Sequence, residues 1–418
     1  MAGGRRIILG LNSGTSADGV DAVACEITGV GVGMRVRVLG HVRRKYPADL
    51  RRRLLAVMAP ASTRTEDLCL LSTEVGEAFA RAARACVKKL GLRRIAFAGA
   101  HGQTVCHLPP GGDLHRSESS ASSRSSGDRR RGRRVFGTMQ IGDAAIIATA
   151  LGVPVVSGFR QADMAIGGQG APLVPWTDYV LFHHPRRSLA VQNIGGIANM
   201  TWLPAGGALD EVIAFDTGPG NMVIDAMVRH FTKGREQYDR GGRRAARGKV
   251  DERVLKRLLD HRFLTTPPPK SCGREVFGEK WVRDVLRRYS SRKSASDDWI
   301  ATATAFTAAS IAMSYALFIS PHCRRYPPVD EVILCGGGAK NPSLVRDLLA
   351  YVSLDGACEG VAVSTTADYG ITPQAKEGVS FAMLAAACVD GVAANLPRVT
   401  GARRRVVLGQ IASPEPRR

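Results

Sequence analysis

The chain has 418 residues, of which 44% are hydrophobic and 23% charged; one core rarely grows past roughly 250–300 residues, so two or three lobes are expected and a small disulfide-stapled scaffold is excluded. Lys and Arg outnumber Asp and Glu by 58 to 37, which gives a net charge of +21. Because neither basic-aromatic interleaving nor a known nucleic-acid module accompanies this charge, we expect a basic surface and no nucleic-acid partner.

Strand-like and helix-like segments alternate along the first half of the chain, which is typical of an α/β architecture. A three-stranded meander is predicted first, followed by helices and further strands. The strands are expected at residues 5–12, 20–27, 35–42, 95–100 and 153–157, and the helices at 49–58, 65–90 and 143–151.

At residue 188 the pattern starts again with a hairpin, a glycine-rich turn and a third strand. Strands are expected at 189–192, 198–203, 211–215, 331–335 and 360–364, and helices at 220–231, 250–259, 274–289, 299–321, 341–351 and 373–389. Because both halves share one plan, we predict a weak internal duplication with lobes at 1–187 and 188–418. The C-terminal helix and tail are assigned to the second lobe. The site is expected in a cleft between the lobes.

Three features of the sequence indicate where the protein is located. Nine cysteines occur singly, without C-x-x-C pairs or zinc spacing, which predicts reduced thiols in a cytoplasmic protein and no cysteine metal site. The apolar run 7–11 is too short for a signal-peptide core. The uncharged segment 299–321 could span a membrane by length, but hydroxyl residues recur in it every three or four positions. That pattern favours a buried core helix, and no membrane partner is expected.

Residues 111–134 stand apart, because Ser, Gly and Arg dominate them and leave almost nothing to bury. We predict a disordered, dispensable loop. Contact with an anionic partner, or phosphorylation, is left open.

Four glycine-rich segments follow predicted strands, at 14–21, 193–199, 216–221 and 336–338. Glycines let backbone N–H groups approach an anion, hydroxyls donate hydrogen bonds, and an acid can hold phosphate-bound Mg²⁺. Each segment alone is explained equally well as a simple turn. Their distribution over both halves favours a nucleotide held between the lobes.

Ten sequence blocks follow one another in the order of a known family. They are LNSGTSADGVDA, AGAHGQTVCHLP, MQIGDAAIIA, VVSGFRQADMAIGGQGAPLVP, NIGGIANMTWLP, FDTGPGNMVIDA, PPPKSCGREVF, ILCGGGAKNP, TTADYGITP and NLPRVTGARRRVVLGQI. They resemble the anhydro-N-acetylmuramic acid kinase family, within the superfamily of actin-like ATPases, sugar kinases and Hsp70 chaperones. The resemblance runs from about residue 7 to residue 411 and leaves out chiefly 111–134.

The resemblance implies a two-lobed α/β fold of duplicated ribonuclease-H-like domains around a central interlobe cleft. It implies an enzyme that uses ATP, with Mg²⁺ bound to the nucleotide, and water. Such enzymes open the 1,6-anhydro ring of anhydro-N-acetylmuramic acid and phosphorylate O6, giving N-acetylmuramic acid 6-phosphate and ADP in the recycling of cell-wall amino sugars. The implied partner is this small-molecule amino sugar, and a homodimer is left open.

The resemblance also implies roles for single residues. Asp163 matches the general base, which would take a proton from the attacking water. The sugar pocket would be lined by His101, Gln103, Thr104, Arg160 and Glu377. The nucleotide would be bound by Gly14, Thr15, Ser16, Ala17, Asp18, Gly19, Val20, Asp21, Asn193, Gly195, Gly196, Asn199, Asp216, Gly218, Gly220, Asn221, Gly336, Gly337 and Gly338.

Structural alternatives stand beside these roles. Asp163 and Asp216 could each cap a helix, His101 could end a strand, and Glu377 could lie on a helix surface. Lys270 and Arg274 are equally open as substrate or structural contacts. The family usually has Asp where this chain has Gly158, and it also differs at Ala17, Gln161, Gly241 and Cys272.

Gly158 makes a different anhydro sugar the first alternative substrate. A nucleotide-binding regulator without catalysis is the alternative from another class.

Overall fold

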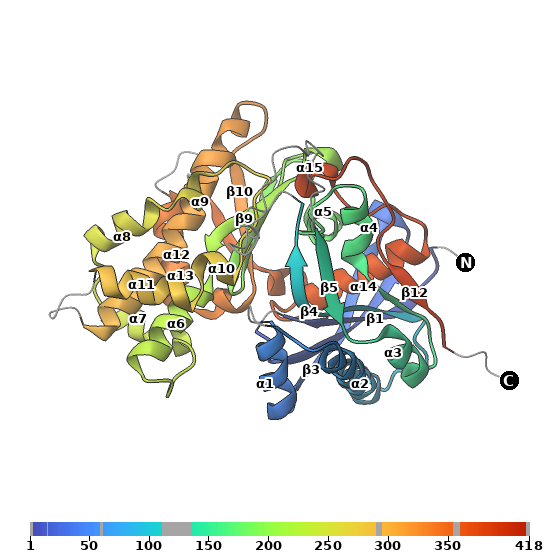
Figure 1. Cartoon of the computed structure of the whole chain (residues 1–418). Helices are drawn as coiled ribbons and strands as arrows, with labels where there is room; N and C mark the ends of the chain where they lie inside the picture. Colours follow the sequence, from blue (N-terminus) through green and yellow to red (C-terminus); the bar gives the residue numbers. More distant parts are fainter. Residues whose placement is uncertain are drawn as a thin grey trace, which may run out of the picture.

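The computed structural model describes residues 3–14, 16–58, 62–110, 136–289, 295–353 and 360–414, with the side chains of Arg274 and Glu275 excepted. The predicted loop 111–134 and Thr15 lie outside these residues, so what the sequence predicts for them stays a prediction. Two lobes stand side by side, each built on a β-sheet (Figure 1).

The first lobe contains a seven-stranded sheet in the order β12-β6-β4-β1-β2-β3, with β5 paired to β4. The strands β1, β2 and β3 form the predicted antiparallel meander, and β4 runs parallel to β1. The bounds are β1 (Arg6–Ser13), β2 (Gly19–Thr28), β3 (Arg35–Lys45), β4 (Phe97–Leu108), β5 (Gly137–Ile141), β6 (Val155–Ser157) and β12 (Gln410–Ala412). The strand expected at 95–100 extends to Leu108 because β5 pairs with its second half.

The second lobe repeats this plan in a five-stranded sheet, β11-β10-β7-β8-β9. An antiparallel meander is again followed by two strands added in parallel, so the two-lobed fold and its duplicated topology are confirmed. The bounds are β7 (Ser188–Ile194), β8 (Ile197–Leu203), β9 (Ile213–Pro219), β10 (Val329–Cys335) and β11 (Ala362–Thr365).

Helices cover both faces of the first sheet. Residues alternate along β1, so Leu9 and Leu11 face the core beneath α2, whereas Ile8 faces the core that contains α14. A Cβ added to Gly10 would lie 1.8 Å from the carbonyl oxygen of Gly378, so a glycine is required for α14 to lie this close to β1. The helices are α1 (Ala48–Val57), α2 (Thr65–Lys89), α3 (Ala144–Leu151), α4 (Phe159–Ala165), α5 (Pro175–Phe182), α14 (Lys376–Val389) and α15 (Pro397–Thr400).

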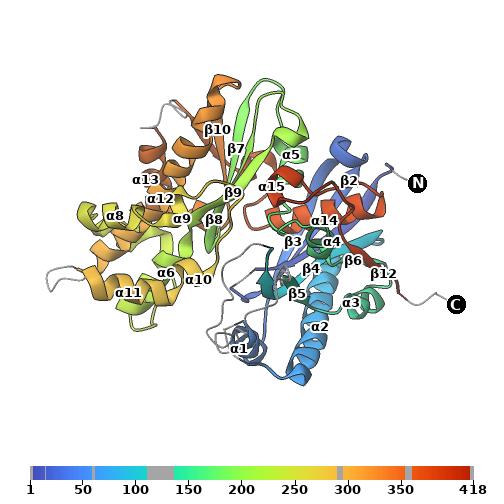
Figure 2. The same cartoon turned by 45° about the horizontal axis from the view of Figure 1, so that its top comes forward.

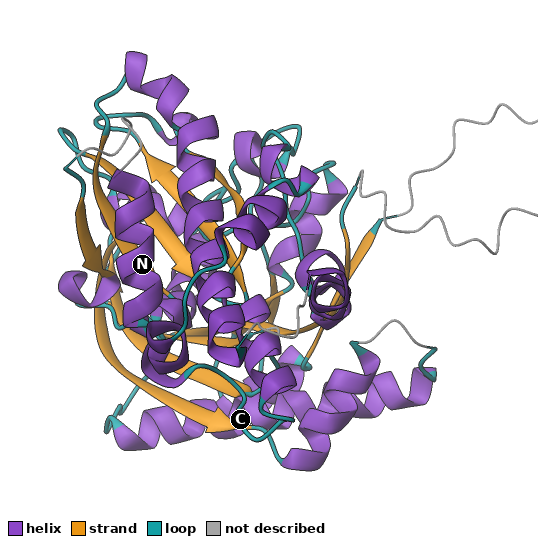
Figure 3. Cartoon of the chain, turned by 90° about the vertical axis from the view of Figure 1, so that its left-hand side faces the viewer, coloured by secondary structure: helices purple, strands orange, loops and turns teal. Residues whose placement is uncertain are grey.

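The second sheet packs on a helical layer centred on α12, visible at the left of Figure 1 and as a dense purple group in Figure 3. By length and hydropathy α12 could cross a membrane, yet 83% of its most apolar window is buried, which confirms the predicted core helix. The helix expected at 274–289 is interrupted at Gly278, which is extended (φ −78°, ψ −171°). The helices are α6 (Asn221–Phe231), α7 (Arg243–Arg247), α8 (Glu252–Leu259), α9 (Arg262–Thr265), α10 (Arg274–Phe277), α11 (Glu279–Tyr289), α12 (Ser296–Phe318) and α13 (Pro342–Ser353).

The end of the chain returns to the first lobe. The helix α14 packs on β1, and the strand β12 pairs with β6. The sequence analysis grouped both segments with the second half. Figure 2 shows this red segment among the blue and cyan strands. A helical pattern predicts that a segment is a helix but not which sheet covers its apolar face. As a result α14 fills a core that receives side chains from both sheets, such as Val23 of β2 and Val191 of β7.

Candidate active site

The first glycine-rich turn joins β1 to β2, and the Gln103 side chain contacts it from the protein interior. This side chain is fully buried; its Nε2 donates to the carbonyl oxygen of Gly14 over 3.2 Å. The Ser13 hydroxyl lies 2.8 Å from the Gly19 carbonyl oxygen and 2.7 Å from Gln103 Oε1. Gln103 is predicted to line the sugar pocket. In the structure it instead supports the first glycine-rich turn from the buried side.

The acids of this turn face different partners. Asp18 accepts from Arg51 Nη2 over 3.0 Å, and Asp21 Oδ1 lies 2.8 Å from His41 Nε2. Gly14 and Ser16 are exposed, whereas Ala17, Gly19 and Val20 are buried. The exposed part of the turn is thus a short stretch of backbone next to one ion-paired acid.

The other three glycine segments come together in the second lobe. The backbone N–H groups of Gly220 and Asn221 donate to the carbonyl oxygens of Gly196 and Gly195 over 2.9 and 2.8 Å. A Cβ on Gly336 would lie 2.6 Å from Asn193 Oδ1. Asn193 pairs across the ladder with Asn199, while Gly218 is buried at the end of β9 and Gly338 against Ile194. Gly337 is exposed and has open space around its Cβ position except for Asn221 Nδ2 at 3.6 Å.

These segments form a surface of backbone groups with little side chain over it, which suits the close approach of phosphates. The two lobes also interact electrostatically here. Burial raises the pKa of Asp225 on α6 to about 7; Arg229 opposes this rise, and Asp18 of the first turn adds to it. Within the described residues no group of three or more His, Cys, Asp or Glu could hold a metal ion. Mg²⁺ that is bound to nucleotide phosphates needs only one or two protein carboxylates, and Asp18 of the first turn is such a carboxylate.

His101, Arg160 and Glu377 lie together in the first lobe. Arg160 Nε donates to His101 Nε2 over 3.1 Å, so His101 carries its proton on Nδ1, which donates to the Gly102 carbonyl oxygen. Burial, with the Arg160 cation adding to it, lowers the pKa of His101 to about 3. Burial also lowers the pKa of Arg160 to about 10, with Glu377 opposing. At neutral pH the cluster therefore contains a neutral imidazole and a charged guanidinium.

Glu377 connects this cluster to β1, the strand that leads into the first glycine-rich turn. Asn12, the penultimate residue of β1, donates from Nδ2 to Glu377 Oε2. Protein surrounds the carboxylate and burial raises its pKa, yet the residue stays accessible to solvent. Thr104 lies apart from this group, on the β4–β5 ladder, where its hydroxyl accepts from Gln140 over 3.4 Å.

Asp163 has a different environment. Its side chain is fully buried and accepts three hydrogen bonds of 2.8 Å, from the Gly170 N–H, Asn395 Nδ2 and Thr400 Oγ1. A Cβ on Gly168 would lie 2.1 Å from Asp163 Oδ2, so the loop lies directly on the carboxylate. This geometry joins α4 to the C-terminal segment.

Asp216, in the middle of β9, is only partly buried. Its N–H donates to the Lys270 carbonyl oxygen over 3.2 Å, and its Oδ2 accepts from the Cys272 N–H over 2.9 Å. The Lys270 ammonium points elsewhere, 4.5 Å from the ring centre of Phe318, and donates to the Leu264 carbonyl oxygen. Lys270, open between two roles on sequence, makes structural contacts that fix the backbone beside Asp216.

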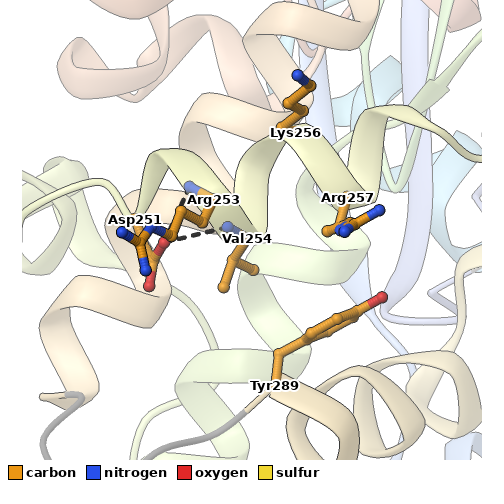
Figure 4. Close-up of a pocket in the computed structure, with 6 residues that line it drawn as sticks. All are labelled: Asp251, Arg253, Val254, Lys256, Arg257 and Tyr289. Atoms are coloured by element: carbon orange, nitrogen blue, oxygen red, sulfur yellow. Dashed lines mark hydrogen bonds between the residues drawn. The ribbon is translucent and has the colours of Figure 1, made fainter.

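A cavity of about 520 Å³ lies elsewhere, on α8 and the end of α11 (Figure 4). Asp251 there caps α8 by accepting from the backbone of Arg253 and Val254. No predicted site residue lines this cavity, and α8 lies at the outer edge of its lobe. The cavity is therefore not part of the candidate site.

Sequence reasoning missed several neighbours of the site. Asn12 lies inside the first block, but no role could be assigned to it from the sequence, because the glycines beside it suggest a turn. Lys376 and Asp178 are 198 positions apart and form a buried ion pair, which no local pattern predicts. Asp225 lies in the FDTGPGNMVIDA block, but its approach to Asp18 depends on how the lobes meet.

A model of the family described as anhydro-N-acetylmuramic acid kinase matches residues 6–117 and 129–414. The anhydro-N-acetylmuramic acid kinase of Caldanaerobacter subterraneus subsp. tengcongensis is 40% identical over 410 residues, covering 97% of each chain. The kinase of that name from Salinibacter ruber is 41% identical over 414 residues, covering 99% of this chain and 97% of the relative. The chain belongs to the anhydro-N-acetylmuramic acid kinase family.

Solved structures with a similar outline are distant from this family member. An activator of 2-hydroxyisocaproyl-CoA dehydratase from Clostridium difficile with bound ADPNP is 12% identical, with a TM-score of 0.39 over 91% of this chain and 94% of the other. A ROK family glucokinase from Streptomyces griseus in complex with glucose and AMPPNP is 11% identical, with a TM-score of 0.38 over 90% and 98%. Scores below 0.5 support no argument about the site.

The glycine at 158 has a backbone explanation in this anhydro-N-acetylmuramic acid kinase family member. Gly158 precedes α4 in a left-handed conformation, with φ +66°. Glycine adopts that conformation without strain, and Asp and Asn are the side chains that tolerate it best. An added Cβ would meet nothing closer than Gln161 Oε1 at 3.4 Å. The departure at Gly158 therefore preserves the backbone that positions Arg160.

Proposed function

We propose that this protein is an ATP-dependent kinase that opens the 1,6-anhydro ring of anhydro-N-acetylmuramic acid and phosphorylates O6. The observation that carries this proposal is the family match, which covers nearly the whole of this chain and of its relatives. The products are N-acetylmuramic acid 6-phosphate and ADP, in the recycling of cell-wall amino sugars.

The reaction balances with one water and one ATP. The water oxygen forms a bond to the anomeric carbon, C1, while the C1–O6 bond breaks. The water proton passes to a carboxylate acting as general base. The freed O6 takes the γ-phosphoryl group, and ADP leaves. Positioning and electrostatic stabilisation supply most of the catalysis in such a transfer.

The nucleotide would lie between the two glycine-rich surfaces. The backbone at Gly14 and Ser16 would contact the phosphates from the first lobe, and the turn at Gly195 and Gly196 from the second. Gly336 to Gly338 would lie beside the adenosine. Asp18 and Asp225 would hold the Mg²⁺ that arrives with ATP, because Asp18 belongs to the first turn and Asp225 lies on α6, which begins at the second glycine-rich surface. Bound Mg²⁺ neutralises phosphate charge during transfer.

The sugar would lie against His101, Arg160 and Glu377. Neutral His101 leaves Arg160 as the cation that suits the lactyl carboxylate of a muramic acid. Glu377 would accept hydrogen bonds from sugar hydroxyls. Gln103 would contribute indirectly, because it supports the first turn.

The base is the element on which sequence and geometry differ. A base must reach its water within hydrogen-bonding distance, directly or through one further water. Asp163, the residue that the sequence predicts, is enclosed by protein and accepts from three donors. Asp216 is partly exposed in the middle of β9, opposite Asn199 of the second turn, and accepts from the Cys272 N–H, while Glu377 accepts from Asn12. We propose Asp216 as the base to be tested first. Asp163, the residue that the sequence predicts, stays the alternative, because hydrogen bonds in a structure without substrate do not exclude a candidate base.

We place the enzyme in the cytoplasm, where ATP is available. We propose the small-molecule sugar as its partner, with no role for nucleic acid or membrane, and we retain the homodimer as a prediction.

The test is ADP release by the purified chain with ATP, Mg²⁺ and each of several sugars. We expect turnover with anhydro-N-acetylmuramic acid and none with N-acetylmuramic acid, which lacks the anhydro bond. Faster turnover of another anhydro sugar would assign the alternative substrate. ADP release that no sugar changes would contradict the kinase and favour a nucleotide-binding regulator.

A further inference from the structure

The helix that carries Glu377 begins at an ion pair that the reaction does not account for. Lys376 Nζ lies 2.6 Å from Asp178 Oδ1, and the two side chains are 5% and 3% exposed. Asp178 Oδ2 accepts a hydrogen bond of 2.7 Å from the Thr201 hydroxyl. Both oxygens of this buried carboxylate are thereby engaged.

Three elements from different parts of the fold meet at this pair. Asp178 lies on α5, the last helix before the chain enters the second lobe, and Thr201 lies on β8 of that lobe. Lys376 begins α14, which packs on the first sheet. One turn further on, the Ser380 hydroxyl accepts from Thr177 over 2.8 Å. The pair therefore fixes the first turn of α14 where the two lobes join.

Stability alone is a weak explanation for such a pair. Removing two charges from water costs several kcal/mol per ion, so buried pairs often contribute nothing net compared with apolar residues of similar size. Removing only one partner is strongly destabilising, because it leaves an uncompensated charge in the interior. The consequence of interest lies at the next residue along the chain.

We propose that Lys376 is a positioning residue for Glu377. Its buried ion pair with Asp178 fixes the first turn of α14, the turn that carries Glu377 to the sugar site. This inference rests on the proposed function, in which Glu377 lines the sugar site.

The charges around Glu377 support this role. Burial raises the pKa of Glu377, and Asp21 on β2 adds to the rise. Lys376 on α14 is the strongest influence that lowers the pKa, followed by the Asn12 amide of β1, and Arg160 of α4 also lowers it. Removing the Lys376 charge therefore shifts the Glu377 pKa upward.

Lys376 in turn stays charged. Burial is the largest single influence and lowers its pKa, but Asp178, Cys335 and Glu377 together outweigh burial, so the pKa of Lys376 is raised. Lys376 is thus a permanent cation beside Glu377 throughout the neutral pH range.

The chain supplies a matched control at the opposite end of the same helix. Asp390, which follows α14, accepts from Arg6 Nη1 and Nη2 over 2.6 and 2.8 Å. This pair is nearly as buried, with side chains 3% and 12% exposed, and it also fastens α14 to β1. Arg6 does not appear among the charges that influence Glu377.

The experiment compares Lys376→Met, the double variant Asp178→Asn with Lys376→Met, and the control Arg6→Met. Binding of anhydro-N-acetylmuramic acid is measured by calorimetry from pH 5 to pH 8, and stability by urea unfolding. For Lys376→Met we expect lower stability, weaker sugar binding and a sugar-binding pH midpoint that is shifted upward. In the double variant stability should recover while the midpoint stays shifted, because neither charge is left alone.

The control separates positioning from general loosening of α14. Arg6→Met should lose stability while keeping the wild-type midpoint and sugar affinity. If Lys376→Met does not fold, the double variant carries the test alone. A wild-type midpoint in the double variant, or the same shift in Arg6→Met, would overturn the inference. If the wild-type chain binds no anhydro sugar, the proposed function fails with it, an outcome distinct from binding that Lys376 does not influence.

Discussion

Asp163 and Glu377 are both carboxylates of the first lobe, yet their surroundings differ in kind. Asp163 is sealed beneath the 167–170 loop, where three donors satisfy it. Glu377 lies at an accessible position, where burial raises its pKa and a single amide donates to it. A carboxylate with all its acceptors engaged holds segments together, whereas an accessible one with a perturbed pKa can respond to a ligand. Asp216, partly exposed in the second lobe, belongs with Glu377 in this comparison.

The largest effect is expected from Asp216→Asn, because the amide keeps the size of the side chain but cannot accept the water proton. Turnover should fall by roughly 10²–10⁴, the usual contribution of a positioned acid or base. Steady-state kinetics with ATP and the anhydro sugar measure this, with calorimetry to show that both ligands still bind. Turnover above about a tenth of the wild-type value would remove Asp216 from the role of base.

Asp163→Asn should act on stability. The introduced NH₂ group faces donors from Gly170, Asn395 or Thr400, so a buried polar group is left without an acceptor, at a cost of about 1–3 kcal/mol. Urea unfolding measures the loss, and turnover of the folded variant at low temperature should stay within a few-fold of wild type. A hundredfold loss of turnover in a fully stable variant would instead assign the base to Asp163, as the sequence predicts.

Glu377→Gln should weaken sugar binding about tenfold, or ~1.4 kcal/mol, while leaving ATP affinity unchanged. The amide can donate to a sugar hydroxyl but lacks the charge that strengthens acceptance of a hydrogen bond. Calorimetric titration with each ligand separates the two affinities. A loss confined to ATP would place Glu377 at the nucleotide.

The remaining prediction concerns acid stability. The pKa of His101 is lowered from 6.5 to about 3 by burial, so the neutral imidazole contributes stability that is complete above pH 6.5. That stability is lost as the pH falls from 6.5 toward 3, because the unfolded chain binds the proton first. His101→Gln should therefore flatten the decline in unfolding free energy between pH 6 and pH 4 by up to about 1.4 kcal/mol per pH unit. An unchanged slope would show that His101 is already charged in the fold.

The sheets were predictable from sequence because strand alternation and glycine-rich turns are local signals. The same signals located the turns at 193–196 and 336–338, which the structure brings together. The position of α14 was not predictable, since an apolar helix fits the face of either sheet, and it lies on β1 because Gly10 and Gly378 permit contact.

Hydrogen-bond partners that depend on tertiary packing could not be predicted from the sequence either. Two of the three donors that enclose Asp163 come from residues more than 230 positions away, Asn395 and Thr400. The family resemblance placed Asp163 within a motif, but only packing shows whether a carboxylate in a motif is accessible. The same holds for Gln103, whose block predicted sugar contact and whose side chain supports the first turn.

The most direct test of the central claim is the mass of the product formed from anhydro-N-acetylmuramic acid, ATP and Mg²⁺. A hydrolytic kinase adds one phosphoryl group and one molecule of water to the sugar, and it releases one ADP per product molecule. We predict that both additions appear together in a single product. Addition of a phosphoryl group without water, or release of ADP without a phosphorylated sugar, would contradict the account.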